Sequence, residues 1–313
     1  MRLVFCGTPA FAVPVLEILL ASGHTVELVI SQPDRPSGRK LEMQPGAVKQ
    51  IAQRRGLAIA QPEKIRTNLA LQQQLGAIAP DAIVVVAYGR LIPPWMLELP
   101  RHGNLNLHAS LLPKYRGAAP IQWAIANGEQ ETGVTTMRID QGLDTGDILL
   151  QQSVPILPDQ TAPEIAANLA TIGAKLMLDT LQGLEAGTLQ PRPQEDNFAT
   201  FAPILRREDG RIDFTLTADR IYSRWRAFQP WPGAFCYLRG KKLTVHAMQV
   251  SQSASHCANP LPGTILRNDD QLFVNSGAGT SIRILELQVE GKRRMDVSTF
   301  LNGFSFLPGE RLE

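Results

Sequence analysis

The sequence predicts an α/β protein in which an open parallel sheet, covered by helices on both faces, is followed by a smaller β-barrel. Near-continuous Val and Ile runs alternate with helical patterns up to about residue 184, as is typical of strands buried on both faces. A proline-containing segment without periodicity then occupies residues 187–203. Beyond it, short apolar runs are separated by Gly, Pro, Asn and Asp, a pattern that predicts a small barrel of the oligonucleotide-binding type.

The first part alternates strands and helices, as a parallel sheet with crossover helices requires. Gly7-Thr8-Pro9 ends the first apolar run, and residues 82–87 form the most buried-looking strand. The predicted strands are 3–6, 25–31, 57–60, 82–87, 105–108, 134–139 and 148–154, and the predicted helices are 11–19, 48–55, 69–75 and 162–184. Thr161 and Glu164 make a capping box at the start of the last helix.

Composition predicts the domain boundaries. Pro191, Pro193 and Pro203 occur in a polar stretch with neither helical nor strand period, which indicates a linker. We therefore expect domains at residues 1–186 and 204–313, joined by a linker at 187–203. In the second domain the pattern predicts a helix at 218–228 and strands at 234–238, 242–250, 263–266, 271–274 and 281–287.

Charge and cysteine content exclude several classes of protein. The 31 Lys and Arg residues nearly balance 29 Asp and Glu residues, which excludes a histone-like tail and an acidic disordered chain. The small basic excess belongs to the chain from Arg207 onward, with 14 basic and 11 acidic residues. Three cysteines without Cys-x-x-Cys spacing argue against a disulfide framework and a zinc site. Without a signal core or a long apolar run, we expect a cytoplasmic protein with no membrane segment.

Common catalytic motifs are absent from the sequence. Pro9, Phe11 and Ala12 stand where a dinucleotide fingerprint needs glycines. The chain contains no P-loop, no H-E-x-x-H and no G-x-S-x-G elbow. Its five histidines lack metal-ligand spacing, so we expect no metal.

The segment from Asn106 to Pro113 is the strongest candidate site. Asn106 and His108 are two residues apart on a predicted strand and therefore share one face. The strand ends in a Pro-containing loop, at the edge where open α/β sheets bind ligands. An amide can donate to an oxyanion and an imidazole can relay protons near neutral pH, so the pair suits acyl transfer. The alternative is a structural pair, since buried Asn and His are common.

A third group is needed to orient or charge the imidazole. The Gly-rich turn from Asp140 to Asp147 offers three carboxylates between two predicted strands. An Asx-rich hairpin loop is the structural alternative, which we favour for Asp140 and Asp147.

These motifs resemble those of the 10-formyltetrahydrofolate-using formyltransferase family. The similarity rests on Asn106-x-His108-x-Ser110-Leu111-Leu112-Pro113, Tyr115-Arg116-Gly117-Ala118-Ala119-Pro120-Ile121 and Gly142-Leu143-Asp144-Thr145-Gly146-Asp147. Gly7-Thr8-Pro9, the segment from Gln32 to Lys40, and Phe228-Gln229-Pro230-Trp231-Pro232-Gly233 extend it over the whole chain. The resemblance implies a Rossmann-like formyltransferase domain followed by an oligonucleotide-binding-like barrel that binds tRNA.

The resemblance also implies a reaction. The α-amine of methionine on initiator methionyl-tRNA would attack the formyl carbon of 10-formyltetrahydrofolate, and the formylated tRNA would serve translation initiation. Asn106 would hold the oxyanion, while His108, supported by Asp144, would assist the proton transfers. The residues that would line the folate site are Ser110, Leu111, Leu112, Pro113, Ala87, Tyr88 and Gly89.

Basic residues are the candidate tRNA contacts. The loop from Gln32 to Lys40 lacks apolar periodicity, which by itself indicates a surface loop. The resemblance implies that this loop enters the acceptor end of initiator tRNA through Arg39, with Arg35 and Lys40 nearby. Many relatives have more basic residues after this arginine, whereas here Leu41-Glu42 follow Lys40. In the barrel, the candidates are Lys241, Lys242, Lys292, Arg293 and Arg294.

Other functions remain open at this stage. A glycinamide ribonucleotide or sugar-nucleotide formyltransferase would leave residues 204–313 unexplained, and a formyltetrahydrofolate hydrolase would need no basic loop. A pure RNA-binding module would not need Asn106, His108 and Asp144 together. For residues 228–233 we favour the role of a packed hydrophobic corner. The alternative is that Trp231 is exposed and stacks on a nucleotide. By resemblance we expect a monomer.

Overall fold

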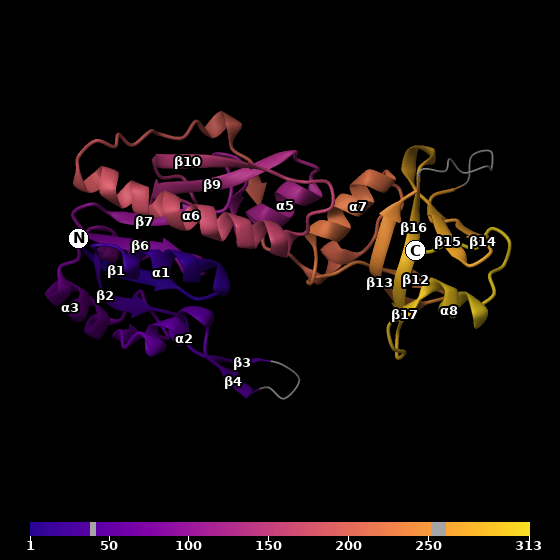
Figure 1. The fold of residues 1–313 in the computed structure, drawn as a ribbon, viewed down its shortest axis with the longest axis horizontal. Coiled ribbons are helices and arrows are strands. Elements are labelled where there is room, and N and C mark those ends of the chain that lie inside the picture. Colours follow the sequence, from indigo (N-terminus) through magenta and orange to yellow (C-terminus); the bar gives the residue numbers. More distant parts are fainter. Residues whose placement is uncertain (38–41, 252–260) are drawn as a thin grey trace. The chain divides into compact units, whose positions relative to one another are not determined.

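The computed structural model describes residues 1–37, 42–251 and 261–313. The chain divides into two compact units (Figure 1). The first comprises Met1–Pro120, Glu131–Pro155 and Glu164–Ala202. The second comprises Ile121–Gln130, Ile156–Pro163 and Pro203–Glu313. Each unit therefore has its own core, and the second draws two short segments from the earlier part of the chain.

A seven-stranded sheet forms the centre of the first unit, in the order β10-β9-β7-β6-β1-β2-β5. Its strands are β1 (Arg2–Gly7), β2 (Thr25–Ile30), β5 (Ile59–Ala60), β6 (Ala82–Val86), β7 (Asn104–His108), β9 (Glu131–Arg138) and β10 (Ile148–Pro155). The five strands from β7 to β5 are parallel. Strands β9 and β10 pair antiparallel, because the nine residues between them form a hairpin loop that is too short for a parallel crossover.

Helices cover both faces of this sheet. They are α1 (Val13–Ala21), α2 (Ala47–Arg54), α3 (Leu69–Ile78), α4 (Pro94–Leu97) and α6 (Ala162–Glu185), with η1 (Ala10–Ala12) before α1. One face packs Val4, Cys6 and Ile83 against Leu75 of α3 and Met96 of α4. On the other face, Gly173 lets α6 lie close to Leu107, since a Cβ there would come within 2.5 Å of the leucine side chain. The predicted helix at 162–184 is confirmed almost to the residue.

The segment predicted as a linker packs along the first unit. It contains η2 (Asp196–Phe198) and β11 (Phe201–Ala202), and β11 pairs parallel with β8 (Arg116–Gly117). Arg192 also makes an isolated antiparallel bridge with Ile148. These pairings leave no apolar pattern in the sequence, because they are made by backbone groups at only one or two positions.

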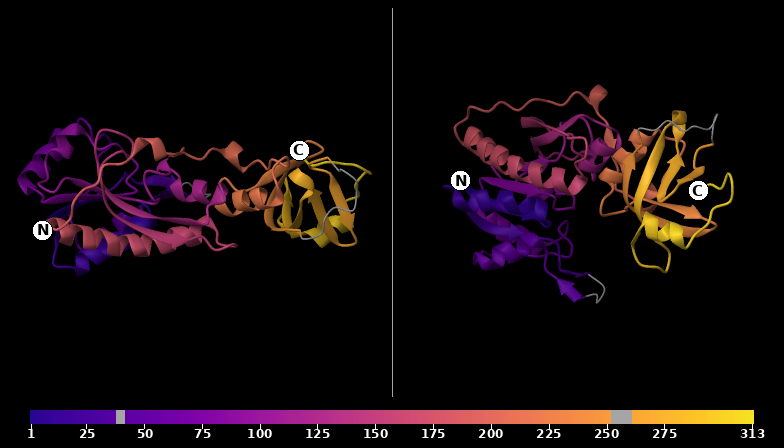
Figure 2. Two further views of the ribbon diagram at one scale, coloured as in Figure 1. Left: turned by 90° about the horizontal axis from the view of Figure 1, so that it is seen from above. Right: turned by 45° about the vertical axis from the view of Figure 1, so that its right-hand side comes forward.

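The second unit is a curled antiparallel half-barrel, whose sheet can be followed in the two views of Figure 2. The strand order is β12-β13-β16-β15-β14, with β17 beside β16. The strands are β12 (Phe235–Leu238), β13 (Lys241–Val250), β14 (Ile265–Asn268), β15 (Gln271–Asn275), β16 (Ser281–Val289) and β17 (Met295–Asp296). Irregular register near Ala247 in the β13–β16 pair bends the sheet, as bulges do.

Two helices and the earlier segments complete this unit. The helices are α7 (Ala218–Ala227) and α8 (Val297–Asn302), with η3 (Arg207–Gly210), η4 (Gly277–Gly279) and most of α5 (Pro120–Ala126). The Tyr222 hydroxyl of α7 donates to Asp159 at 2.9 Å. The buried Arg226 guanidinium donates to the Gln160 carbonyl at 2.8 Å, and the Trp123 and Phe228 rings meet edge to face.

Candidate active site

Strand β7 places Asn106 and His108 on the same face of the sheet. Asn106 pairs in register with Val85 of β6 and Met137 of β9, and lies between them. Its neighbour Asn104 donates to the Met96 carbonyl at 2.9 Å. The half-buried Asn106 side chain has no hydrogen bond to any residue that the structure describes, so its amide is free to donate to a ligand.

Each ring nitrogen of the His108 imidazole faces a polar group, and one of them is hydrogen-bonded. Nε2 lies 2.9 Å from the Tyr115 carbonyl oxygen. A carbonyl only accepts, so this contact requires the proton on Nε2 and leaves the lone pair of the neutral ring on Nδ1. Nδ1 lies 3.7 Å from Oδ2 of Asp144. A proton taken up at Nδ1 would therefore face a carboxylate.

Asp144 sits at a constrained position in the loop between β9 and β10. Its φ of 54° lies in the left-handed region, which non-glycine residues occupy at a cost. Oδ2 accepts a hydrogen bond from the Gly117 amide at 2.8 Å. Asp140 instead closes the same loop on itself, accepting from the Gly142 amide and the Thr145 hydroxyl. Asp144 alone among the three loop carboxylates lies within 4 Å of a histidine nitrogen in the described residues.

The loop after β7 is fixed from beneath by two polar side chains of the hairpin. The Thr135 hydroxyl donates to the Ser110 carbonyl at 2.6 Å and accepts from the Leu112 amide. Gln151 donates to the Leu112 carbonyl at 2.8 Å. The Ser110 hydroxyl is used inside the loop, donating to the Lys114 carbonyl. Leu112 is buried, while Leu111 and Pro113 are half-buried.

The segment from Ala87 to Gly89 follows β6, the strand beside β7. Ala87 and Gly89 have φ values of 47° and 76°, so the chain turns sharply at the edge where β7 also ends. The Tyr88 ring is buried, and burial raises the pKa of its hydroxyl to about 12. Ala87 and Gly89 are exposed, leaving their backbone accessible beside Asn106.

The basic loop begins at a network of polar contacts beside this turn. Gln32 donates to the Tyr88 carbonyl and accepts from Arg90. Asp34 accepts from Lys49 at 2.6 Å and from Gln61 at 2.8 Å, and these hydrogen bonds lower the pKa of its carboxyl. Short strands β3 (Arg35–Ser37) and β4 (Glu42–Gln44) follow. Arg35 is exposed on β3, whereas Arg39 and Lys40 lie outside the described residues.

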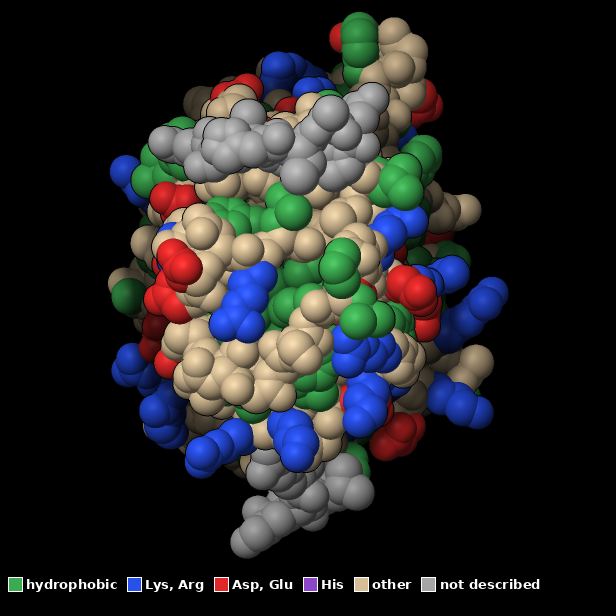
Figure 3. Space-filling model, turned by 90° about the vertical axis from the view of Figure 1, so that its right-hand side faces the viewer, with side chains coloured by type: hydrophobic (Ala, Val, Ile, Leu, Met, Phe, Trp, Pro, Cys, Tyr) green, Lys and Arg blue, Asp and Glu red, His purple; other side chains and the backbone are tan. Residues whose placement is uncertain are grey.

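The basic residues predicted to bind tRNA in the barrel differ in whether their side chains already contact other residues. Lys242 lies over the Phe235 ring, 4.0 Å from its centroid, and burial lowers the pKa of its ammonium. Arg294 pairs with Glu286 on β16. Lys241, Lys292 and Arg293 are exposed. Figure 3 shows Lys and Arg at many separate positions on the face it presents, with Asp and Glu among them.

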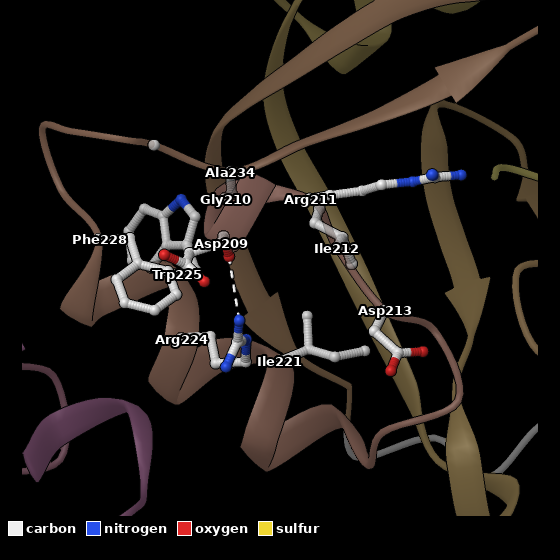
Figure 4. Close-up of a pocket in the computed structure, with 11 residues that line it drawn as sticks. Asp209, Gly210, Arg211, Ile212, Asp213, Ile221, Arg224, Trp225, Phe228 and Ala234 are labelled. Atoms are coloured by element: carbon white, nitrogen blue, oxygen red, sulfur yellow. Dashed lines mark hydrogen bonds between the residues drawn. The ribbon is translucent and has the colours of Figure 1, made fainter. Parts of the chain in front are cut away.

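A pocket in the second unit lies between η3 and α7, and its lining includes Ile221, Trp225 and Phe228 (Figure 4). Arg224 donates to the Asp209 carbonyl across it at 3.0 Å. The pocket holds about 10 Å³, which is at most the space of one water molecule. It is therefore a packing feature of the barrel.

Several residues around the site were missed by the sequence-based predictions. Thr135, Gln151 and Gln194 all hold the loops that surround His108. Their polar contacts reach backbone carbonyls far away in the chain, for which no spacing rule exists. The described residues contain no group of three or more His, Cys, Asp or Glu side chains placed to hold a metal ion. Nor does any helix in the described part of the chain have the length and apolar character needed to cross a membrane.

Comparison with known proteins matches both parts of the chain. The model of the formyl transferase family matches residues 1–181, and that of the formyl transferase C-terminal domain matches residues 204–305. A methionyl-tRNA formyltransferase of Acidobacterium capsulatum is 59% identical over 312 residues, covering 100% of this chain and 99% of the relative. The one of Caldanaerobacter subterraneus is 44% identical over 313 residues, covering 100% of each.

Solved structures share the fold at lower identity. An N-formyltransferase from Helicobacter canadensis, in complex with folinic acid and dTDP-3-aminofucose, has a TM-score of 0.67 at 19% identity and covers 91% of this chain and 98% of its own. HypX from Aquifex aeolicus, in complex with tetrahydrofolic acid, has a TM-score of 0.62 at 19% identity, with coverage of 96% and 47%. At these identities the likeness concerns the fold.

Proposed function

Because the chain belongs to the formyl transferase family, we propose that it transfers the formyl group of 10-formyltetrahydrofolate to the α-amino group of methionine on initiator methionyl-tRNA. The observation that carries this proposal is the full-length match to relatives named methionyl-tRNA formyltransferase, at up to 59% identity. The product, N-formylmethionyl-tRNA, would be used to start translation. Such a reaction belongs in the cytoplasm, where we expect the protein as a monomer.

The catalytic group is Asn106, His108 and Asp144. The amine nitrogen bonds to the formyl carbon, and the bond from that carbon to N10 of the folate then breaks. The free amide of Asn106 donates to the oxygen that becomes negatively charged. His108 takes the proton released by the amine on Nδ1, where the carboxylate of Asp144 stabilises the imidazolium, and returns it for N10.

The folate site comprises the two turns that follow β6 and β7. Accessible backbone at Ala87 and Gly89 supports a role in hydrogen bonding to a flat heterocycle, and Tyr88 packs beneath them. From the other turn, Leu111 and Pro113 are accessible enough to contact the ligand. Ser110 and Leu112 shape this loop from inside, since the Ser110 hydroxyl is bonded to Lys114 and the Leu112 side chain is buried.

The tRNA would be held by the basic loop and by the barrel. Arg35, Arg39 and Lys40 belong to the loop that would enter the acceptor end, and the exposed Lys241, Lys292 and Arg293 would contact phosphates. Lys242 and Arg294 would contribute less to phosphate binding. The Lys242 ammonium lies over the Phe235 ring, and the Arg294 guanidinium is paired with Glu286. We assign residues 1–186 to catalysis, 187–203 to a connecting segment and 204–313 to tRNA binding.

Formyl transfer with three acceptors tests this function. The purified protein is given 10-formyltetrahydrofolate with charged initiator tRNA, with charged elongator methionine tRNA, or with no acceptor. Transfer selective for the initiator is the expected result. Formate release without transfer would mean a formyltetrahydrofolate hydrolase, and transfer to an amino sugar nucleotide in place of tRNA would mean a sugar formyltransferase.

A further inference from the structure

The Gln194 side chain bridges the two loops that surround His108. Its amide nitrogen donates to the carbonyls of Asp144 and Gly146, each at 2.8 Å. Its amide oxygen accepts from Nε and Nη2 of Arg116, at 3.0 and 2.8 Å. A carboxamide has two donor hydrogens and an acceptor oxygen with two lone pairs, so all four positions are used.

Both bridged loops place a polar group against the imidazole. Tyr115, next to Arg116, supplies the carbonyl on Nε2, and Asp144 supplies the carboxylate facing Nδ1. Asp144 also has the left-handed backbone conformation, which persists only where its surroundings enforce it. The direction of its carboxylate depends on that backbone, and the Gln194 amide is bonded to the carbonyl of the same residue.

We propose that Gln194 is a positioning residue for formyl transfer, which fixes the backbone of Asp144 so that the carboxylate faces Nδ1 of His108. The inference rests on the proposed function, because it needs the His108–Asp144 pair to move protons. The segment at 187–203, predicted as a linker from the sequence, thereby contributes a residue to the proposed catalytic site.

The two halves of the amide have different importance. On the acceptor side, Arg116 has a second partner, because Nη2 also lies 2.8 Å from Asp196. On the donor side, no other side chain in the described residues donates to the carbonyls of Asp144 and Gly146. If Gln194 were only a structural anchor, its amide oxygen, which accepts from Arg116, would matter most. The positioning role depends instead on its amide nitrogen, which donates to the two carbonyls.

Gln194→Glu separates these roles, since it keeps the acceptor for Arg116 and places an oxygen against two carbonyl oxygens. We expect kcat to fall about tenfold or more, with KM for the folate within about twofold of wild type and the Arg116 contact retained. If the glutamate variant fails to fold, Gln194→Ala takes its place. It removes both the donor and the acceptor of the amide and should lower kcat similarly. Glu195→Ala is the matched control, because Glu195 is exposed and its side chain makes no cap hydrogen bond. Unchanged kcat in the folded Gln194 variants would overturn the proposal.

A double-mutant cycle with Asp144→Ala adds a measurement that a purely structural role would not affect. If Gln194 acts through Asp144, Gln194→Ala should change kcat by less than about twofold once the carboxylate is gone. The same tenfold loss in both backgrounds would overturn the positioning role while leaving the proposed function intact. Full turnover by Asp144→Ala alone would instead refute the proposed role of Asp144.

Discussion

At the residue scale, the hydrogen bond from His108 to the Tyr115 carbonyl determines which ring nitrogen can act as the proposed base. With the proton on Nε2, the ring can accept a proton only at Nδ1, beside Asp144. In the proposed reaction, the carboxylate would therefore stabilise the imidazolium and would not select the neutral tautomer. Asn106 lies on the same strand face with its amide unused, so the two side chains are free for separate steps of one reaction.

Replacing Asn106 tests the oxyanion role. Asn106→Ala should lower the single-turnover rate of formyl transfer about 10²-fold or more, because one donor to a developing oxyanion is lost. Its thermal midpoint should stay close to that of wild type, since the side chain makes no hydrogen bond to the residues that the structure describes. Asn104→Ala is the contrasting variant: it should lower the midpoint by removing the bond to Met96. An unchanged rate in Asn106→Ala would remove this residue from the mechanism.

The residues of the proposed site differ in how far the sequence could predict them. Asn106 and His108 follow from the two-residue period of a strand. For Asp144, the sequence offers three carboxylates on one Gly-rich loop, and the family resemblance implies its role, because a loop has no period. Gln194 could not be predicted, since its partners are two backbone carbonyls about 50 residues away and the Arg116 side chain, 78 residues away.

At the element scale, β3 and β4 form a hairpin that begins beside the anchored Asp34, and the sequence between the two strands is basic. Arg39→Ala should lower kcat/KM for charged initiator tRNA while leaving folate affinity unchanged, because Arg39 is remote in the chain from both proposed folate turns. Glu42→Ala, which removes an acidic residue from the same segment of the sequence, should not weaken the use of tRNA. Equal losses of tRNA use and folate affinity in Arg39→Ala would mean that the loop supports folding.

The anchor of this hairpin gives a pH-dependent prediction. Lys49 and Gln61 lower the folded-state pKa of Asp34, so its contribution to stability is present above the ordinary value of 3.8 and is lost as the pH falls through the lowered pKa. Asp34→Asn should therefore have a lower thermal midpoint than wild type at pH 7, and the gap should narrow as the pH falls below 3.8. A gap that does not change with pH would contradict this assignment.

Most elements were predicted correctly where apolar periodicity was strong, as in α6 and the strands of the half-barrel. The antiparallel pairing of β9 with β7 departs from the predicted parallel sheet, because the apolar content of β9 resembles that of the parallel strands. The hairpin loop favoured for Asp140 and Asp147 agrees with the antiparallel pairing of β9 with β10. The pairing of β11 with β8 was also missed, since two residues held by backbone hydrogen bonds leave no pattern.

At the scale of the whole molecule, the second unit is larger than the sequence boundary at residue 204 implies. It includes Ile121–Gln130 and Ile156–Pro163, and α7 is bonded to both. Arg226 is buried and donates to the carbonyls of Leu157 and Gln160. A buried guanidinium without such partners is costly, at about 1–3 kcal/mol or more.

A fragment of residues 204–313 tests this organisation. Without its earlier partners, α7 should exchange its backbone amides faster than the same helix does in the full chain. Hydrogen exchange measured by mass spectrometry resolves the helix, and α8, within the same fragment, serves as the internal reference. Equal protection of α7 in the fragment and the full chain would show that residues 204–313 form the complete unit.

The most direct test of the central claim separates chemistry from binding at His108. Single-turnover formyl transfer to charged initiator tRNA and equilibrium binding of a folate analogue are measured for the wild type and for His108→Ala. We predict a loss of transfer of about 10²-fold or more, with folate affinity within about threefold of wild type. Transfer at the wild-type rate, or a loss of folate binding that accounts for the whole effect, would contradict the assignment of His108 as the base.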